Sequence, residues 1–502
     1  MSHLLDRLAS WKPFTALVVG DFMLDELVHG NIDRLANDAP VPVMHVQRTE
    51  QRPGGAANVG LDLAAMRGRV LAFGAVGSDR AGQELRALMS ASGVEPAGLI
   101  EDPSRPTTVK RSLIGLAQHR HAQKMFRMDY ESREPLADRA AGALIDAVRE
   151  HLHGADVVCI EDYAKGVCTP RVCQGVIEAA RAAGVPVMVD PAALNDYSRY
   201  RGAAVITPNR SEAEKACGRR VGDRAPAEAY APLARELVES LALDAAVVTL
   251  DKDGALLLER QGEPRAVPTV ARRVYDVTGA GDMVLAALAA ARANGLDWFD
   301  SVRFANAAAG LEVEEFGVVP IALERIHRDI LQRERATRGK RRSLEELLVE
   351  IAAIRHPGNG QADARRPRIV LANGCFDVLH AGHVSLLRRA AALGDFLVVA
   401  VNDDAGVRKL KGPGRPIYPI EDRVQLLGEL ECVGAVVVFS EDTPERLIRA
   451  VKPDVLVKGA QYDPACVPGA AFVESYGGQL ALLDVVEGRS TTGTVERIRT
   501  AN

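Results

Sequence analysis

The stretch Asp276-Val-Thr-Gly-Ala-Gly-Asp-Met283 joins a candidate phosphate cradle to a candidate base. Gly279, Ala280 and Gly281 are small enough to let backbone N–H groups close on an anion. The residues from 282 to 294 favour a helix, so these amides are expected at a helix N-terminus, where the macrodipole favours negative charge. Asp282 can accept a proton from a hydroxyl there. The pattern indicates phosphoryl transfer, with a plain glycine turn as the alternative.

A second stretch, Asn373-Gly-Cys-Phe-Asp-Val-Leu-His-Ala-Gly-His383, follows the strand-like run IVLA. His380 and His383 are three residues apart, so both fall on one face of the helix expected here. Two imidazoles beside Asn373 can hold the phosphates of a nucleotide while its α-phosphorus is attacked. A zinc site would need a third ligand and usually a different spacing, and two unrelated histidines are the other alternative.

The composition describes a soluble globular protein with about two to four domains: 502 residues, 47% hydrophobic and 26% charged. The net charge of -5 argues against a nucleic-acid partner. No apolar signal core or run of about 18 apolar residues is present, so we expect no membrane partner. The seven cysteines lack CxxC pairing and suit a reducing compartment. We therefore expect a cytoplasmic protein.

Short apolar runs alternate with helical stretches along the whole chain, which predicts an α/β protein of two parallel-sheet domains. We expect one domain over residues 1–330, a helix and linker over 331–366, and a smaller Rossmann-like domain over 367–502. Expected strands of the first domain are 16–21, 70–77, 156–162, 185–190, 203–209 and 245–250. Those of the second are 368–373, 395–402, 434–439, 453–459 and 480–486.

Polar residues near the first domain's strands complete a candidate kinase site. Asn209 and Glu212, three apart at a helix start, can order magnesium and its waters, although a capping box is an equal alternative. The carboxylates of Asp21 and Asp25 and the amide of Asn58 suit a polyhydroxyl ligand, and Gly54 and Gly55 allow it a close approach. Lys110 and Arg127 can hold a phosphate already on the sugar, with a solvated basic face as the alternative.

Residues 12 to about 330 resemble the ribokinase-type sugar kinases, through GDFMLD (20–25), GGAANVG (54–60), DYAKG (162–166), TPNRSE (207–212) and DVTGAGD (276–282). The resemblance implies transfer of the γ-phosphoryl group of ATP to a sugar hydroxyl, with Asp282 as general base. It places the anion hole at 279–281 and implies that Asp21 binds the sugar. Residues implied to serve magnesium and ATP are Asn209, Arg210, Ser211 and Glu212, with Asn306 either near adenine or in helix packing.

The last 135 or so residues resemble the cytidylyltransferase-like nucleotidyltransferases, with NGCFDVLHAGH (373–383) as the HxGH signature. In that family the histidines matching His380 and His383 stabilise the pentavalent α-phosphorus. The substrate's phosphate is the nucleophile, so no protein base is needed. Residues implied to contact nucleotide or phosphate are Asn373, Phe376, Asp377, Lys411, Arg415, Lys458, Ser490, Thr491 and Thr492.

The fusion as a whole resembles the bifunctional heptose-phosphate kinase/adenylyltransferases of bacterial lipopolysaccharide biosynthesis. The resemblance implies two Mg²⁺-dependent reactions of ATP and small-molecule sugar phosphates. The first gives the 1,7-bisphosphate of D-glycero-β-D-manno-heptose, and the second joins heptose 1-phosphate to AMP as ADP-heptose. It also suggests a homodimer. The alternatives are another sugar phosphate, CTP in the second step, a nucleotide-sensing regulator, or an interaction protein. Departures from the family pattern fall at 118–124 and 459–462.

Overall fold

The computed structural model describes residues 4, 7–8, 10–115, 123–222, 225–269, 274–315, 317–355, 366–460 and 462–484. The chain divides into two compact units, one spanning Trp11–Ile326 and the other comprising Met1–Ser10 and His327–Asn502. The segment 331–366, expected as a separate helix and linker, falls within the second of these units. None of the helices in the described part combines the length and apolarity that crossing a bilayer requires.

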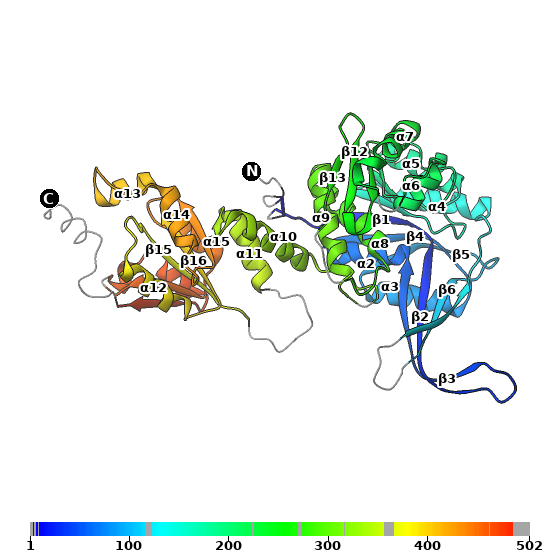
Figure 1. The fold of residues 1–502 in the computed structure, drawn as a ribbon, viewed down its shortest axis with the longest axis horizontal. Coiled ribbons are helices and arrows are strands. Elements are labelled where there is room, and N and C mark those ends of the chain that lie inside the picture. The colour runs from blue at the N-terminus through cyan, green and yellow to red at the C-terminus, as the bar shows by residue number, and fades with distance from the viewer. Residues whose placement is uncertain are drawn as a thin grey trace. The chain divides into compact units, whose positions relative to one another are not determined.

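The N-terminal unit is built on a sheet whose described part has nine strands (Figure 1). Its order is β13-β12-β11-β10-β9-β8-β1-β4-β5, parallel except for β12 and β13 at one edge. All six predicted strands of this domain lie in the sheet, which also contains strands that the sequence did not predict. The strands are β1 (Phe14–Gly20), β4 (Gly68–Val76), β5 (Val94–Glu101), β8 (Val157–Glu161), β9 (Val187–Asp190), β10 (Val205–Ile206), β11 (Ala245–Thr249), β12 (Ala255–Glu259) and β13 (Arg265–Val267).

Helices cover both faces of this sheet, which is why its strands are continuous apolar runs. On one face, Leu17 and Val19 of β1 share a core with α4 (Asp138–His151), α5 (Pro170–Ala182) and α7 (Ala231–Leu241). The other face contacts α2 (Ala56–Ala65) and α8 (Ala280–Ala293), and α9 (Trp298–Glu312) packs against α8. The unit also contains α3 (Arg80–Ala91), α6 (Arg210–Ala216) and 3-10 turns at Ser198–Tyr200, Ala227–Tyr230 and Asp251–Asp253.

A second, four-stranded sheet was not predicted from the sequence. Its order is β3-β2-β6-β7, formed by β3 (Pro42–Gly55), β2 (Phe22–Leu35), β6 (Thr108–Gly115) and β7 (Gln123–Tyr130). A single residue, Asp21, separates β1 from β2, and the β2–β3 hairpin extends away from the main sheet (Figure 1). Because β2 starts directly after the carboxyl end of β1, this sheet begins at the edge of the main sheet where ligands of parallel sheets bind, and it can cover a ligand there.

The second unit is a smaller sheet with helices on both faces, as predicted. Its six described strands are all parallel in the order β14-β17-β16-β15-β18-β19. Their bounds are β14 (Arg341–Arg342), β15 (Ile369–Gly374), β16 (Phe396–Asn402), β17 (Ala435–Phe439), β18 (Val455–Gly459) and β19 (Gln479–Leu483). Chain order reverses between β15 and its neighbours β16 and β18. Ligands of open parallel sheets bind at the carboxyl end of such a strand.

Apolar side chains of α11, α15 and α16 share a core with one face of this sheet, and those of α12 and α14 with the other. The helices are α10 (Leu323–Arg338), α11 (Leu344–Arg355), α12 (Ala381–Ala391), α13 (Asp404–Lys411), α14 (Ile420–Gly428), α15 (Glu445–Val451) and α16 (Ala470–Ser475), with a 3-10 turn at Pro464–Cys466. Because Leu347 and Ile351 of α11 enter this core, α11 is an integral part of the second domain.

Candidate active sites

The glycine-rich stretch of the first domain forms the N-terminus of α8. Gly279 is the N-cap residue, with a φ of 91° that favours glycine, and the helix starts at Ala280, two residues before the predicted start. Asp276 closes the preceding turn, because its Oδ1 accepts hydrogen bonds from the backbone N–H and hydroxyl of Thr278 at 3.0 and 2.7 Å. The N–H groups of residues 280 and 281 therefore lie at a helix start, as an anion hole requires.

Close packing explains why this turn needs glycines. A Cβ at Gly279 would lie 2.8 Å from Oε1 of Glu312 and 3.0 Å from Val318. At Gly281 it would lie 3.3 Å from Oδ2 of Asp190. Larger residues would push the α8 N-terminus away from its neighbours.

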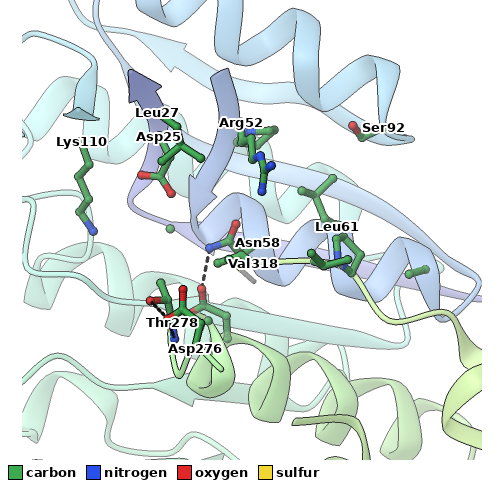
Figure 2. A pocket seen from close by; sticks show the side chains of 18 of the residues that line it. Asp25, Leu27, Arg52, Asn58, Leu61, Ser92, Lys110, Asp276, Thr278 and Val318 are labelled. Carbon is green, nitrogen blue, oxygen red and sulfur yellow. Dashed lines mark hydrogen bonds between the residues drawn. The ribbon is translucent and has the colours of Figure 1, made fainter. Parts of the chain in front are cut away.

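Asp282, in the first turn of α8, is 3% exposed and accepts one hydrogen bond on each oxygen. The Asn58 amide donates to Oδ2 at 2.8 Å (Figure 2), and the Tyr163 hydroxyl donates to Oδ1 at 2.7 Å. Burial raises the pKa of Asp282 to about 6, while the hydrogen bonds from Asn58 and Tyr163 and the charge of Lys110 act to lower it. Asp282 is therefore largely a carboxylate at neutral pH, as a general base must be.

A cavity of about 890 Å³ opens above Asp282 and contains most of the predicted sugar-site residues. Figure 2 shows Asp25 and Lys110 reaching into it from one side, and Thr278 and Asp276 from the opposite side. Burial raises the pKa of the Asp25 carboxyl and lowers that of the Lys110 amine. The other basic residues that line it are Arg52, Lys124 and Arg127. The basic side chains predicted at 110 and 127 thus face one cavity with the base.

Asp21 has a different place from the one expected. It is 2% exposed, is absent from the cavity lining, and its carboxylate accepts backbone hydrogen bonds from Tyr163, Lys165 and Val167 at 3.0, 3.0 and 3.1 Å. The expectation that Asp21 binds the sugar directly is corrected, because its oxygens are used to hold this loop. Gly55 lines the cavity, with a φ of 60°.

Gly54 makes room for a sugar-site side chain. A Cβ at Gly54 would lie 2.5 Å from Oδ2 of Asp25, so the glycine permits the position of that carboxylate.

The Asn209–Glu212 pair forms the capping box that was weighed as an alternative. The Asn209 side chain accepts from Glu212 N at 3.0 Å, and Glu212 Oε2 accepts from Asn209 N at 2.8 Å. Ser211 donates to the Asn209 side chain at 2.8 Å. This cap orients Glu212 through Oε2, and burial raises the pKa of its carboxyl.

Two residues expected near ATP are used within the fold. The Arg210 guanidinium donates to Asp253 Oδ2 at 2.6 Å and to Leu250 O at 3.0 Å. The Asn306 amide donates to the Val267 carbonyl at 2.9 Å, which agrees with the packing alternative. Arg210 is therefore corrected to a structural role, since its side chain is buried and paired.

Sequence reasoning missed Tyr163, Glu161 and Asp190 as site residues. The carboxyl oxygens of Glu161, Asp190 and Asp282 lie within 4.8 Å of one another. Glu161 and Asp190 end the neighbouring strands β8 and β9, and burial raises both pKa values. The signal was present, because each is an acid at the end of an apolar strand, where parallel sheets place ligand-binding groups.

In the second domain, the two histidines lie together at the N-terminus of α12. His380 is the N-cap residue, its Nδ1 accepts from Gly382 N at 3.2 Å, and its ring stacks on His383 with centroids 3.9 Å apart. The Phe376 ring meets His383 edge-on at 5.3 Å. Burial, and then the charges of His380 and Lys411, lower the pKa of His383 to about 4. His383 is therefore a neutral imidazole at assay pH.

Asp377 and Arg415 form an ion pair with each other. Asp377 is fully buried and also accepts from Ile417 N at 2.5 Å, so its expected role as a direct phosphate contact is corrected to anchoring the 415–418 loop. Arg415 Nη2 is buried without a partner among the described residues. One nitrogen of this guanidinium thus stays available for a phosphate oxygen.

Arg423, which the sequence reasoning did not include in the site, is 1% exposed and joins the loops around the histidines. It donates to Cys375 O at 2.7 Å, to Asn402 O at 2.8 Å and to Asp404 Oδ1 at 2.6 Å. Its signal was weak, because an arginine in the first turn of a helix is usually a surface residue.

Lys411 and Lys458 are the other predicted cations of this site. Lys411 ends α13, and Lys458 lies on β18 with its Nζ 5.1 Å from the centre of the Tyr462 ring. Burial lowers the pKa of Lys458 to about 8. The Asn373 Oδ1 is buried without a partner among the described residues, as is His383 Nδ1. Ser490, Thr491 and Thr492 lie outside the described residues.

Comparison with known families divides the chain in the same way. Residues 16–324 match the pfkB family of carbohydrate kinases, and residues 371–478 match the cytidylyltransferase-like family. The fold of the first part resembles phosphofructokinase-2 from Escherichia coli in complex with potassium, with a TM-score of 0.53 and 19% identity over 64% of this chain and 99% of the other. The same enzyme in complex with substrates and products also gives 0.53 and 19%, over 64% and 100%.

Full-length relatives carry both parts in one polypeptide. The bifunctional protein HldE of Ectopseudomonas mendocina is 44% identical over 96% of this chain and 97% of its own. That of Trichlorobacter lovleyi is 42% identical over 96% and 95%. The chain therefore belongs to the HldE family of bifunctional proteins, which joins a heptose kinase of the pfkB carbohydrate-kinase fold to an adenylyltransferase.

Proposed function

We propose that the first domain phosphorylates O1 of D-glycero-β-D-manno-heptose 7-phosphate with ATP. The observation that carries this proposal is the single cavity in which the buried Asp282 carboxylate faces Lys110, Lys124 and Arg127. A base suits the acceptor hydroxyl, and the basic side chains suit a phosphate that the sugar already bears. The carbohydrate-kinase match and the HldE relatives support the same assignment.

In this reaction Asp282 takes the proton of the acceptor hydroxyl. The sugar oxygen then bonds to the γ-phosphorus of ATP, the bond from that phosphorus to the bridging oxygen breaks, and ADP leaves. The N–H groups at the start of α8, beginning with Ala280 and Gly281, lie where they can stabilise charge on the transferring phosphoryl group. Asn58 and Asp25, which line the same cavity, suit the sugar's other hydroxyl groups.

Magnesium fits the oxygen-rich side of this site. Glu161 Oε2 is buried without a partner among the described residues, and its neighbour Asp190 is also a carboxylate. Hard cations prefer such ligands. We assign Asn209 and Glu212 to Mg²⁺ through water, with Asp190 beside them. When bound, Mg²⁺ neutralises charge on the phosphates of ATP.

The second domain is assigned the adenylyl transfer that makes ADP-heptose. A phosphate oxygen of heptose 1-phosphate attacks the α-phosphorus of ATP, and pyrophosphate leaves. The stacked His380 and His383 lie at a helix N-terminus, where they can hold the α-phosphate. Lys411, Arg415 and Lys458 are cations suited to the remaining phosphates. The choice of ATP over CTP follows from the HldE relatives.

We also propose a cytoplasmic homodimer. Both reactions consume ATP, which suits the cytoplasm, and the cysteines are all free thiols. The edge strand β7 exposes Met125 and Phe126, which favours self-association through the kinase domain. Light scattering on the purified chain should give twice the mass of 53.8 kDa.

Phosphorus NMR of the purified chain tests both activities together. With Mg²⁺, ATP and heptose 7-phosphate, a new anomeric phosphate is expected. Addition of a 7-phosphatase should then give pyrophosphate and a sugar–nucleotide diphosphate. An absent anomeric phosphate would exclude this heptose as the acceptor, and product formation with CTP instead of ATP would overturn the assignment of the second nucleotide.

A further inference from the structure

Tyr163 lies on a loop whose backbone is held at several points. The Asp21 carboxylate accepts from the N–H groups of Tyr163, Lys165 and Val167, and Asp162 Oδ1 accepts from Ala164 N at 2.7 Å. Both carboxylates are buried. Since these contacts fix the loop, the Tyr163 side chain starts from a well-defined position next to the cavity.

The Tyr163 side chain connects that loop to the general base. Its hydroxyl donates to Asp282 Oδ1 at 2.7 Å, and Lys110 Nζ lies 4.7 Å from the centre of its ring. Burial and the neighbouring Asp282 raise the pKa of Tyr163, so the phenol keeps its proton and stays a donor. Asn58 donates to the other oxygen of Asp282. Each oxygen of the carboxylate therefore accepts a hydrogen bond from a neutral donor.

Two properties of a general base depend on such donors. A hydrogen bond to a carboxylate favours its ionised form, which opposes the effect of burial on Asp282. It also fixes the rotation of the carboxyl group, and proton transfer needs that orientation. Tyr163 can supply both effects to Asp282, although it lies on a separate loop and not on α8.

We propose that Tyr163 is a positioning residue of sugar phosphorylation, which holds the Asp282 carboxylate ionised and oriented toward the acceptor hydroxyl. This inference rests on the proposed kinase function. This role differs from that of a tyrosine that only packs in the core. Tyr197 is such a residue, because it is buried and its hydroxyl has no partner among the described residues. Tyr197 is therefore the matched control for loss of a phenolic oxygen.

The test is the pH profile of kcat/KM for sugar phosphorylation in Tyr163→Phe, which keeps the ring under Lys110 and removes one oxygen. Loss of the donor should raise the pKa of Asp282, so the acidic limb should move to higher pH by about one unit or more. At pH values well below the acidic limb, kcat/KM should therefore fall about tenfold, and it should return to the wild-type value at alkaline pH. KM for ATP should not change. Tyr197→Phe should keep the wild-type profile.

A ring-fluorinated tyrosine at position 163 should shift the acidic limb of the pH profile in the opposite direction. Its more acidic phenol donates a stronger hydrogen bond, so the acidic limb should move to lower pH. This second variant tests the hydrogen bond to Asp282 even if Tyr163→Phe is poorly folded, because it keeps the ring and the hydroxyl of the native side chain. An unmoved limb in the fluorinated protein, or equal loss at every pH in a folded Tyr163→Phe, would overturn the role of Tyr163. Failure of the wild-type enzyme to phosphorylate heptose 7-phosphate would instead overturn the proposed function.

Discussion

At the scale of single residues, Asp282 and His380 belong to different domains and separate reactions. Asp282→Asn keeps the size of the side chain but removes the base, so sugar phosphorylation should fall by about 10²–10⁴-fold. Adenylyl transfer should be unchanged, because every residue of that site lies in the domain that begins at His327. Parallel assays of both reactions on one preparation measure this, and loss of both would contradict the two-site arrangement.

His380→Ala should give the reverse pattern. The substitution removes the imidazole stacked on His383 and an acceptor for Gly382 N, so adenylyl transfer should fall while sugar phosphorylation is kept. The neighbouring ring offers a direct check in the wild-type protein. NMR titration of His383 should show a midpoint near pH 4, because burial disfavours its charged form. A midpoint above 6 would contradict the assignment of a neutral imidazole.

A buried carboxyl should make the kinase domain less stable at high pH. Burial raises the pKa of Glu312 from 4.5 to about 8, and both of its oxygens lack partners among the described residues. An acid with a higher pKa in the folded chain costs stability as pH rises from 4.5 to 8. Glu312→Gln should therefore raise the free energy of unfolding by roughly 1–3 kcal/mol at pH 8, and the gain should shrink to a small fraction of this at pH 4.

Thermal unfolding at these two pH values measures the effect. Glu239→Gln, at an exposed position of α7, is the control and should leave the pH dependence as it is. Equal melting temperatures for wild type and Glu312→Gln at pH 8 would show that Glu312 does not carry this cost.

Residue types in motifs predicted the reactive groups, but their partners could not be found this way. Asp282, His380 and His383 stand out because each follows a glycine-rich or strand-ending pattern. Tyr163 contacts Asp282 across 119 residues, because α8 packs against β8, the strand that ends two residues before Tyr163. The same holds for Asp21, whose oxygens serve a loop more than 140 residues away.

At the scale of elements, the loop of residues 162–167 depends on one carboxylate. Asp21→Ala would leave three backbone N–H groups without their acceptor, so destabilisation of about 2–5 kcal/mol is expected. The amides of Tyr163, Lys165 and Val167 should exchange hydrogen faster, and kinase activity should fall because Tyr163 is displaced. Hydrogen exchange by mass spectrometry measures this, with peptides of β15 and β16 as the unaffected control.

Most strands that are continuous apolar runs were predicted, although the buried run ALLLE of β12 was missed, and the strands without such a run were missed as well. The strands β1, β8, β15 and β17 are largely apolar runs, because both faces of a parallel sheet are covered. By contrast, every residue of β7 is at least partly exposed, and so are residues 42–53 of β3. Such strands are held by pairing with their neighbours, and the pairing partner is not visible in the local sequence.

At the scale of the whole molecule, the family and the order of its two domains followed from motif order alone. The domain division did not follow, because the helical composition of the segment after Ile326 is the same whether it belongs to the first domain or to the second. Its assignment rests on long-range contacts: Leu347 and Ile351 enter the core of the second sheet, and β14 pairs with β17. The fusion therefore links two complete folds, each with the residues of its own active site.

This separation predicts that the two activities can be supplied by different chains. In a mixture of Asp282→Asn and His380→Ala proteins, with a 7-phosphatase present, the first variant lacks only the kinase and the second only the transferase. Heptose 1-phosphate must leave the phosphatase before the second step, so it is free in solution and either chain can use it. ADP-heptose formation from heptose 7-phosphate should therefore recover to about half the wild-type rate at equal total protein, whereas each variant alone, or a chain carrying both substitutions, should stay inactive. A mixture as inactive as its components would mean that one chain's two sites act on a shared intermediate, and the folds could then not be treated as independent.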